Sequence, residues 1–471
     1  MQMRFWLLPM VLITLQCKAV PFNNPSDSQS KDFWKTQFLR CFSEDWECWE
    51  IPQDNQGVKE WTRLLGAGGV NTFSSSTATE RNGNIYSVGT TSGSLAGQMK
   101  ISSGSLNDIF LAKYDREGNL LWLKQMGSLG VASSAPELAH IDRFGDIYIV
   151  GTSDAPFNEL PASATGSLLI KLNPSGTVLW TRIIPSGVDF LGYGVTTDAD
   201  GSAFITGNTE ETYLNGDVAG GNRNIFVIKY NRNGDFGWSR LIGQASFAAY
   251  GQQIQYDPYS KSILATGTVS GVGSFLGTNL PGGLTDSYLL SLDSNNGAFK
   301  WVRYLGLAGG TASTTLRALS VDKKGSVYLT GDVNADIDSQ IKDGGTVQIL
   351  TKFSVTGDKL WTRLLGGGGS SITNVSQVFA DNASHIYTTG NTTGTLNGIA
   401  RSGLQDAYLT KYDANGNLIW IRTSGSSGST IYGRGISSDK YGTLYVSGST
   451  DGSFDGQFKQ GTTDAFLSKY K

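Results

Sequence analysis

The stretch from Asp108 to Gly127 reads Asp-Ile-Phe-Leu-Ala-Lys-Tyr-Asp-Arg-Glu-Gly-Asn-Leu-Leu-Trp-Leu-Lys-Gln-Met-Gly. Residues 109–114 and 120–125 are rich in aliphatic and aromatic side chains, as half-buried β-strands require. The residues between them include Gly118 and Asn119, which tolerate the positive φ that a short hairpin loop needs. The stretch therefore predicts a β-hairpin.

This hairpin recurs along the chain with a period of about 60 residues. Its marker is a tryptophan followed two positions later by arginine or lysine. Burial of each indole would remove about 150–250 Å² of surface from water, so we expect the tryptophans to be structural anchors between repeats. For the cations, protection of an exposed outer strand edge is favoured over contact with an acidic partner. The seven tryptophans are Trp61, Trp122, Trp180, Trp238, Trp301, Trp361 and Trp420.

A second signature lies between consecutive tryptophans. It is an acidic residue, a turn, and a strand that contains tyrosine or another large side chain and ends in glycine, as in Asp322 to Gly331. We expect the acidic side chain to accept hydrogen bonds from backbone amides of its turn. Each copy predicts another hairpin, so one period holds four strands. Seven such periods predict an all-β fold, a seven-bladed β-propeller of four-stranded antiparallel blades over residues 57–471.

The two ends of the repeat region complement each other. The first tryptophan strand, residues 59–65, has no partner strand before it, and the last strand, residues 464–470, has no tryptophan strand after it. Pairing these two segments would complete the last blade and cover a strand edge that would otherwise be exposed. The sequence therefore predicts a closed ring rather than an open solenoid.

The motifs resemble those of the bacterial seven-bladed β-propeller repeat family. Units of that family carry the patterns Asp-x-x-Gly-Asn-x-Tyr-Val-x-Gly and Asp-x-Phe-x-x-Lys-Tyr-x-x-x-Gly-x-x-x-Trp. The resemblance covers about residues 57–471 and implies the propeller fold. It implies little about activity, because many members resemble surface or secreted proteins of unknown role.

Residues 1–16 have the pattern of a secretory signal peptide, with Arg4 before an apolar run too short to span a bilayer. Cys17 then resembles the lipidation site of bacterial lipoproteins. Thr14 and Gln16 depart from the usual lipoprotein box, so the closest resemblance is to the looser spirochaete type. This implies a lipid anchor on Cys17 at the periplasmic or surface face of the outer membrane. The alternative is cleavage after Ala19 and a secreted or periplasmic protein.

Residues 17–56 are expected to form a polar tether and a short aromatic-rich N-terminal extension. Packing of this extension on the propeller, or blockage of its channel, is favoured over a partner-binding aromatic patch. Cys41 and Cys48 remain in the chain under either route of signal processing. In an exported protein this pair is a candidate disulfide, and two free, buried thiols are the alternative.

The composition argues against several classes of function. The formal charge of −3 provides no basic field for nucleic acid, and we expect membrane contact only through the N-terminal lipid. Two histidines and three cysteines leave little material for a metal site or a histidine-based catalytic site. We therefore predict no metal, no cofactor and no catalytic residue.

The sequence favours a monomeric, non-catalytic binding or scaffold protein for a protein or glycan partner. Binding residues usually lie on loops held by a rigid scaffold. The long loops between the second and third strands of the repeats should share one face with the loops that join successive repeats. These long loops span residues 90–107, 208–223, 268–285 and 391–405. The alternative is an exported enzyme, a hydrolase or lyase acting on glycans, that uses loop carboxylates such as Asp217, Asp286 or Asp406.

Overall fold

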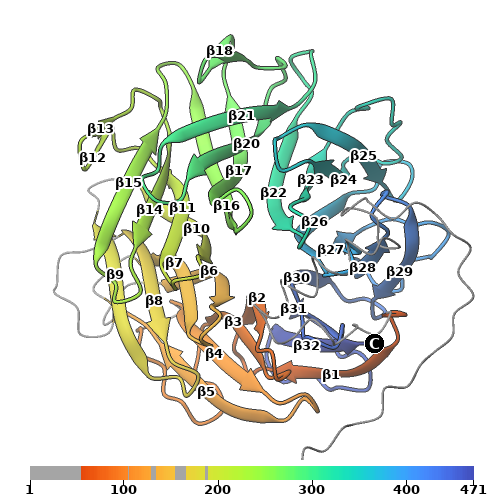
Figure 1. The fold of residues 1–471 in the computed structure, drawn as a ribbon. Coiled ribbons are helices and arrows are strands. Elements are labelled where there is room, and N and C mark those ends of the chain that lie inside the picture. The colour runs from red at the N-terminus through yellow and green to blue at the C-terminus, as the bar shows by residue number, and fades with distance from the viewer. Residues whose placement is uncertain (1–54, 104–105, 129–133, 154–156, 158–165, 186–188) are drawn as a thin grey trace, which may run out of the picture. The chain divides into compact units, whose positions relative to one another are not determined.

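The computed structural model describes residues 55–471 except 104–105, 129–133, 154–156, 158–165 and 186–188. These residues form a ring of seven four-stranded antiparallel sheets, which confirms the predicted seven-bladed β-propeller (Figure 1). The predicted signal peptide and nearly all of the segment 17–56 lie outside the described residues. Within the described part of the chain, no helix is long and apolar enough to cross a bilayer.

Each blade contains four strands, called first to fourth from the ring axis outward. The first strands are β2 (Thr72–Thr79), β6 (Ser134–Ile141), β10 (Phe190–Thr197), β16 (Ala248–Asp257), β22 (Thr314–Val321), β26 (Thr373–Ala380) and β30 (Ile431–Ser438), and they number the blades one to seven. The second strands are β3 (Ile85–Thr91), β7 (Ile147–Ser153), β11 (Ala203–Thr209), β17 (Ser262–Ser270), β23 (Val327–Val333), β27 (Ile386–Thr392) and β31 (Leu444–Thr450).

The outer half of each blade is the hairpin that the sequence predicts. The third strands are β4 (Asp108–Tyr114), β8 (Gly166–Leu172), β14 (Asn224–Tyr230), β20 (Asp286–Asp293), β24 (Val347–Phe353), β28 (Asp406–Tyr412) and β32 (Asp464–Tyr470). The fourth strands are β5 (Leu120–Met126), β9 (Val178–Pro185), β15 (Phe236–Ile242), β21 (Phe299–Leu305), β25 (Lys359–Leu365), β29 (Leu418–Ser424) and, in the seventh blade, β1 (Lys59–Leu65).

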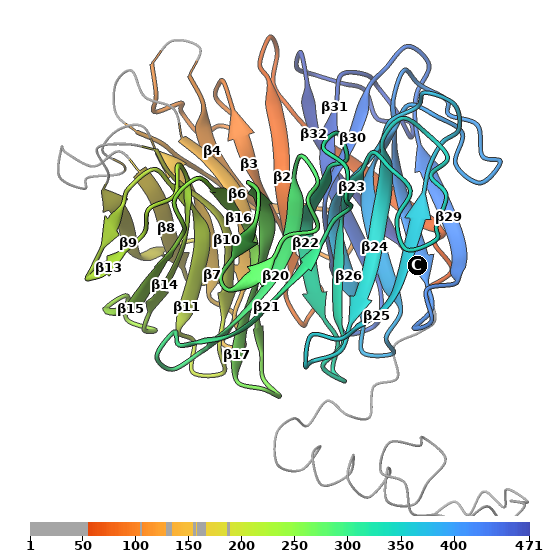
Figure 2. The same cartoon turned by 90° about the horizontal axis from the view of Figure 1, so that it is seen from above.

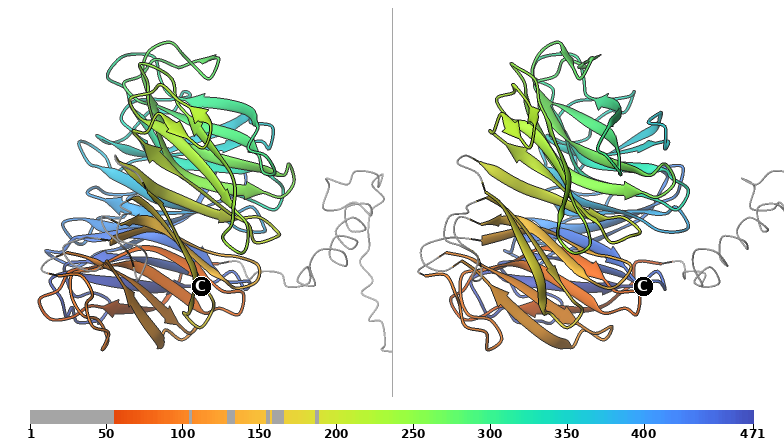
Figure 3. Two further views of the ribbon diagram at one scale, coloured as in Figure 1. Left: turned by 90° about the vertical axis from the view of Figure 1, so that its left-hand side faces the viewer. Right: turned by 60° about the vertical axis from the view of Figure 1, so that its left-hand side comes forward.

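The strands run between two faces of the ring (Figure 2). Because neighbouring strands are antiparallel, the loops from second to third strands and the loops between blades emerge on one face, which we call the loop face. The remaining short turns lie on the opposite face, the turn face; Figure 3 shows both faces from the side. Two long loops on the loop face contain short hairpins. These are β12 (Tyr213–Leu214) with β13 (Asp217–Val218), and β18 (Ser274–Phe275) with β19 (Thr278–Asn279).

The second and third strands form the buried middle of each blade. Every side chain of β31 and β32 is buried, for example. The apolar cores lie between adjacent blades: Phe204 and Val227 of the third blade pack in one cluster with Ile263 and Leu290 of the fourth. Removal of this apolar surface from water therefore stabilises the contacts between blades as well as each sheet.

The structure confirms ring closure. β1 pairs with β32 in antiparallel register, with Thr62 opposite Ser468 and Leu64 opposite Phe466. Just beyond the strands, the backbones of Val58 and Lys471 exchange two hydrogen bonds of 2.8 Å. The first strand of the sequence is thus the fourth strand of the last blade.

Asn55, Gln56 and Gly57, shortly before β1, take the place of the turn that joins the third and fourth strands in the other blades. Asn55 is 3% exposed, and its Nδ2 donates hydrogen bonds to the carbonyl oxygens of Gly442 (2.9 Å) and Tyr470 (3.0 Å). Its Oδ1 accepts the backbone N–H of Gly57 at 2.8 Å. The Asn55 side chain thereby joins the segment before β1 to the end of β32, where the other blades have a continuous backbone.

The Trp-x-Arg signature joins neighbouring blades. In the sixth blade, Trp420 Nε1 donates to the Asn55 carbonyl at 3.1 Å. Arg422 donates from Nε to the Gly57 carbonyl (3.0 Å) and from Nη2 to the Gln56 carbonyl (2.7 Å). The guanidinium carbon also lies 5.1 Å from the centroid of the Trp420 ring. We call this contact the blade latch. It gives the cation a role in blade docking that differs from the expected protection of an outer edge.

The blade latch recurs at the other six junctions of the ring. Six of the seven tryptophans are half-buried there, and Trp238 is 9% exposed. In every case the cation donates to the carbonyl of a turn glycine in the next blade. The pairs are Arg63 with Gly118, Lys124 with Gly176, Arg182 with Gly234, Arg240 with Gly297, Arg303 with Gly357 and Arg363 with Gly416.

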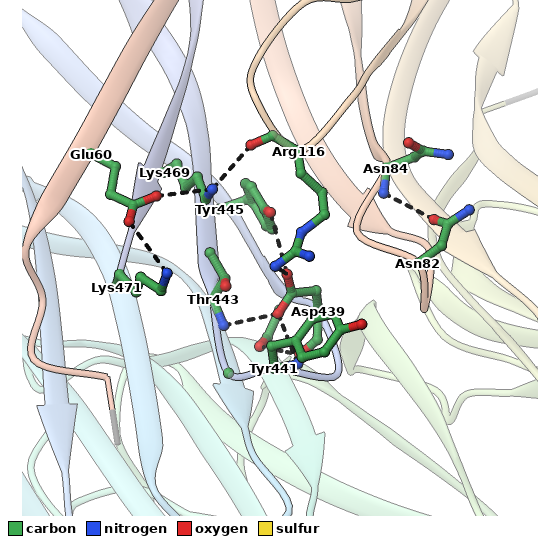
Figure 4. A network of polar contacts seen from close by, with 12 residues as sticks. Glu60, Asn82, Asn84, Arg116, Asp439, Tyr441, Thr443, Tyr445, Lys469 and Lys471 are labelled. Carbon is green, nitrogen blue, oxygen red and sulfur yellow. Dashed lines mark hydrogen bonds and ion pairs between the residues drawn. The ribbon is translucent and has the colours of Figure 1, made fainter. Parts of the chain in front are cut away.

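Charged side chains add to the closure between the seventh and first blades (Figure 4). Lys469 Nζ lies 2.9 Å from Glu60 Oε2 and donates to the Arg116 carbonyl at 3.1 Å. Arg116 Nη2 lies 3.5 Å from Asp439 Oδ2. Asp439 also accepts the backbone N–H of Thr443 at 3.0 Å, which is the role expected of the acidic residue in its turn.

Every first strand carries a β-bulge opposite the glycine that ends the second sequence signature. In the fifth blade the pairing register skips Arg317, between Leu316 and Ala318. A Cβ placed on Gly331 of the second strand would lie 2.0 Å from the Thr315 carbonyl oxygen, which no real side chain can do. The glycine is therefore required by the close approach of the bulged backbone.

The same arrangement occurs in all seven blades. The glycines concerned are Gly89, Gly151, Gly207, Gly267, Gly331, Gly390 and Gly448, each with a first-strand carbonyl oxygen 1.8 to 2.1 Å from the position of a Cβ. The skipped residues, which we call the bulge residues, are Ser75, Glu137, Tyr193, Gln252, Arg317, Ser376 and Arg434.

Gly331→Ala should lower the free energy of unfolding by at least about 2 kcal/mol, because the added methyl group forces β22 away from β23. Urea denaturation measures this change. Gly310→Ala is the matched control, since nothing lies within 4 Å of a Cβ at that position. Equal losses in the two variants would contradict the assigned role of Gly331.

Asn55→Ala should cost about 2 kcal/mol of stability, because it leaves one buried N–H and two carbonyl oxygens without their partner. The midpoint of thermal unfolding reports the loss. Asn233→Ala, in the corresponding turn of the third blade, is the control because that side chain is exposed. A transition unchanged by Asn55→Ala would mean that this residue does not hold the ring closed.

Candidate functional site

A cavity of about 690 Å³ lies at the ring axis. All seven bulge residues line it, so each blade contributes one such side chain from its first strand. Other lining residues come from the ends of second strands, among them Asn391 and Ser449. Because first strands begin and second strands end at the loop face, the cavity lies toward that face.

The side chains at the bulge differ between blades, whereas the glycine opposite them does not. They comprise two serines, two arginines, a glutamate, a tyrosine and a glutamine. A bulge redirects the extra side chain of its strand. The fold thus specifies the backbone at these seven positions without specifying the side chain, which leaves the chemistry of the cavity free to suit a ligand.

Two arginines flank the sixth blade at the cavity. Arg317, from the fifth blade, places Nε 2.7 Å from Asp332 Oδ2, and Asp332 Oδ1 accepts the backbone N–H of Val375 at 3.1 Å. Arg434, from the seventh blade, lies over the ring of Tyr432 with 5.4 Å between the guanidinium carbon and the ring centroid. Within the described part of the chain, no carboxylate lies within ion-pair distance of Arg434.

The second and third blades line the cavity with a carboxyl and a phenol. Enclosure by the channel walls raises the pKa of Glu137 to about 7, and the charge of Arg434 acts in the opposite direction. Burial raises the pKa of Tyr193, and the negative charge of Glu137 adds to that effect. Glu137 nevertheless remains accessible to solvent. The net charge of the cavity therefore changes close to neutral pH.

Two glutamines join three blades at the cavity wall. Gln253 Nε2, from the fourth blade, donates to Gln377 Oε1, from the sixth blade, at 3.3 Å. Gln253 Oε1 accepts the backbone N–H of Leu319 on the intervening first strand. These bonds fix the position of the fifth blade's bulge relative to its neighbours.

One buried donor at the cavity has no acceptor. Asn391 lines the cavity and is 4% exposed, and its Nδ2 has no hydrogen-bond partner among the described residues. A buried amide without a partner costs free energy, and such groups in native structures call for an explanation.

The three loop carboxylates considered for an enzyme do not line the cavity. They lie in three different blades, and each accepts hydrogen bonds from backbone N–H groups that hold a loop in place. The bonds are Asp217 with Leu241 (3.1 Å), Asp286 with Gly282 (3.1 Å) and Gly283 (3.4 Å), and Asp406 with Ser402 (2.7 Å) and Gly403 (2.8 Å).

The other residues singled out from the sequence lie away from the cavity or outside the described residues. Cys17, Cys41 and Cys48 are outside, so the lipid anchor and the disulfide stay predictions. The seven tryptophans lie on the outermost strands. Among the described residues, no three His, Cys, Asp or Glu side chains are grouped so that they could hold a metal ion.

Sequence reasoning missed the bulge residues, although a signal for them exists. Each stands fourteen positions before the glycine of its second strand, or fifteen in the fourth blade, where the turn is one residue longer. A repeated glycine in a strand interior indicates a bulge or a close backbone approach. Combined with this spacing, the glycine would have located all seven positions.

Comparison with known proteins supports the repeat assignment. A family model described as beta-propeller repeat matches residues 60–96 and 300–338. Both segments run from a fourth strand through the bulge and glycine of the next blade. An uncharacterized WD repeat-containing protein of Acanthamoeba polyphaga mimivirus is 26% identical over 71% of this chain and 30% of its own length. The chain thus spans less than a third of that relative.

Similar solved structures share low sequence identity with this chain. The structure of U3-55K is 10% identical, covers 88% of this chain and 99% of its own, and has a TM-score of 0.49. The polysaccharide lyase Uly1 is 11% identical, with coverage of 92% and 95% and a TM-score of 0.47. Likenesses of this strength carry no conclusion about function. The chain is a seven-bladed β-propeller, and the two matched segments support the β-propeller repeat family as the source of its repeating unit.

Proposed function

We propose that this chain is a non-catalytic binding or scaffold module whose ligand enters the axial cavity from the loop face. The observation that carries the proposal is the ring of bulge residues, which presents one side chain from each blade to a single cavity. Its volume of about 690 Å³ falls within the range of about 300–1,000 Å³ typical of ligand sites.

A glycan is the partner that this cavity suits best. Its lining contains four serines, two asparagines and three glutamines, together with tyrosine, and these groups can exchange hydrogen bonds with sugar hydroxyls. The ring of Tyr193 offers an apolar face against which a sugar ring can pack. The blade latches hold these side chains on a closed frame, which limits the ordering cost of binding.

The alternative function is an exported hydrolase or lyase that acts on glycans. Its proposed carboxylates, Asp217, Asp286 and Asp406, hold loops through backbone N–H groups, so the support for binding is stronger. The two functions differ in whether a bound glycan is shortened. A binding screen that also analyses its products therefore separates them.

The proposed location is the bacterial outer membrane, through a lipid on Cys17. The support is the apolar leader of residues 1–16 and the cysteine that follows it. Secretion or retention in the periplasm is the alternative. In either case an exported binding module would meet glycans of the cell envelope or its surroundings.

Ser376→Trp should weaken binding of any glycan that the purified full chain retains in a panel screen by at least about tenfold. The bulge directs the new indole into the cavity, where it occupies the ligand's space without entering the blade core. Asn415→Trp, in a turn of the same blade on the turn face, should leave binding unchanged. Undiminished binding by Ser376→Trp would contradict the axial site, and shortened glycan products would favour the enzyme.

Lipidation predicts that the mature chain begins at Cys17 and carries acyl chains in the native bacterium. Mass spectrometry of the N-terminal peptide should show the added mass, and Cys17→Ala should abolish it and release the protein from membranes. A mature terminus at Val20 without lipid would contradict the anchor.

A further inference from the structure

We infer that the cavity binds the carboxylate of an acidic oligosaccharide, such as a uronic acid unit, over the sixth blade between Arg317 and Arg434. This inference rests on the proposed glycan-binding function and goes further by naming the class of sugar. The blades on either side of the sixth each supply one of the arginines, and the sixth blade supplies the small Ser376 between them.

The arrangement of Arg317 leaves part of its guanidinium for a ligand. Its bond to Asp332 uses Nε, and Asp332 is fixed in turn by the backbone of Val375. The two terminal nitrogens remain as donors in a planar fork whose geometry matches a carboxylate. Asp332 thus acts as a positioning residue that directs Arg317 and does not itself face the ligand.

Arg434 supplies a second cation whose charge is not balanced by a direct ion pair among the described residues. Its contact with the Tyr432 ring restrains the guanidinium near the cavity wall. Arg317 and Arg434 line the same cavity from the two blades that flank the sixth. Two cations that face one cavity repel each other, and an anion placed between them would relieve that repulsion.

The sixth blade adds a neutral donor between the two cations. Ser376 lines this stretch of wall, and its hydroxyl can donate to an oxygen atom. A ligand with acceptor oxygens on a carboxylate and on its neighbouring ring would serve all of these donors together.

Charge balance favours a single negative charge over a phosphate dianion. Arg317 and Arg434 contribute two positive charges, and Asp332 contributes one negative charge. Glu137 is the remaining charged group among the described lining residues; it projects from the second blade, and its charge and that of Arg434 act on each other. A monoanion therefore fits the net charge of the arginines and Asp332, while Glu137, when ionised, opposes a second anionic group.

Isothermal titration of the purified full chain at pH 7 tests this inference with three probes. These are a trisaccharide with one galacturonic acid unit and two galactose units, the neutral galactose trimer of the same linkage, and an acidic peptide of equal charge. The acidic sugar should bind at least about tenfold more tightly than the neutral sugar, as a charge-assisted bond implies. The peptide should bind more weakly than the acidic sugar.

Variants assign the selectivity to the cavity. Arg434→Gln should weaken the acidic trimer about tenfold or more and leave the neutral trimer unchanged, whereas Glu137→Gln should tighten the acidic trimer. Arg143→Gln makes the same charge change at an exposed position on the turn face and should have no effect. Circular dichroism of each variant establishes that it is folded.

The outcomes separate this inference from the function on which it rests. Equal binding of the two sugars, or an unaltered affinity in folded Arg434→Gln, would overturn the acidic specificity and leave a glycan-binding module. Preference for the peptide would overturn the sugar class. Binding of none of the probes would overturn the inference and remove the support for a glycan site.

Discussion

The close approach of two backbones near the ring axis is the constraint on which the structure depends. At each blade a glycine of the second strand lies so near the bulged first strand that any Cβ would collide with a carbonyl oxygen. This contact sets the register of the inner hairpin and directs one extra side chain out of the sheet. Seven repetitions around a closed ring turn a local backbone feature into a cavity with seven independent side chains.

A second set of contacts allows that cavity to persist. The blade latches bind each fourth strand to a turn of the following blade through an indole, a cation and backbone carbonyls. Asn55 extends this pattern to the seventh blade, where β32 and β1 are not joined by a turn. These contacts dock neighbouring blades at the outer rim, where the tryptophans repeat. The bulge residues face the cavity, so docking at the outer rim does not restrict their identity.

The sequence was sufficient for the architecture because its signals were local and repeated. The hairpin at Asp108–Gly127, its period and the complementary ends predict the blade count and ring closure without knowledge of any contact. The role of Arg422 could not be predicted in this way, because its acceptors at Gln56 and Gly57 are distant in sequence. The hydrogen bond between Gln253 and Gln377 could not be predicted from the sequence either, since it joins two blades across a third. The bulge residues are an intermediate case. Their spacing from a repeated glycine is present in the sequence, but their place in the cavity depends on the bulge, which the structure shows.

The ring of bulge residues is tested most directly by two neighbouring serines of the first blade. Ser75 is the bulge residue and lines the cavity, whereas Ser76 beside it is 1% exposed and does not line the cavity. Each would be replaced separately by cysteine in a chain whose native cysteines are changed to serine, and the rate of reaction with a small maleimide would be followed in the folded protein. Because the bulge directs position 75 into the cavity, Ser75→Cys should react rapidly and Ser76→Cys should be strongly protected. Protection at position 75 with reaction at position 76 would place a different side chain in the cavity and would contradict the assigned role of the bulge.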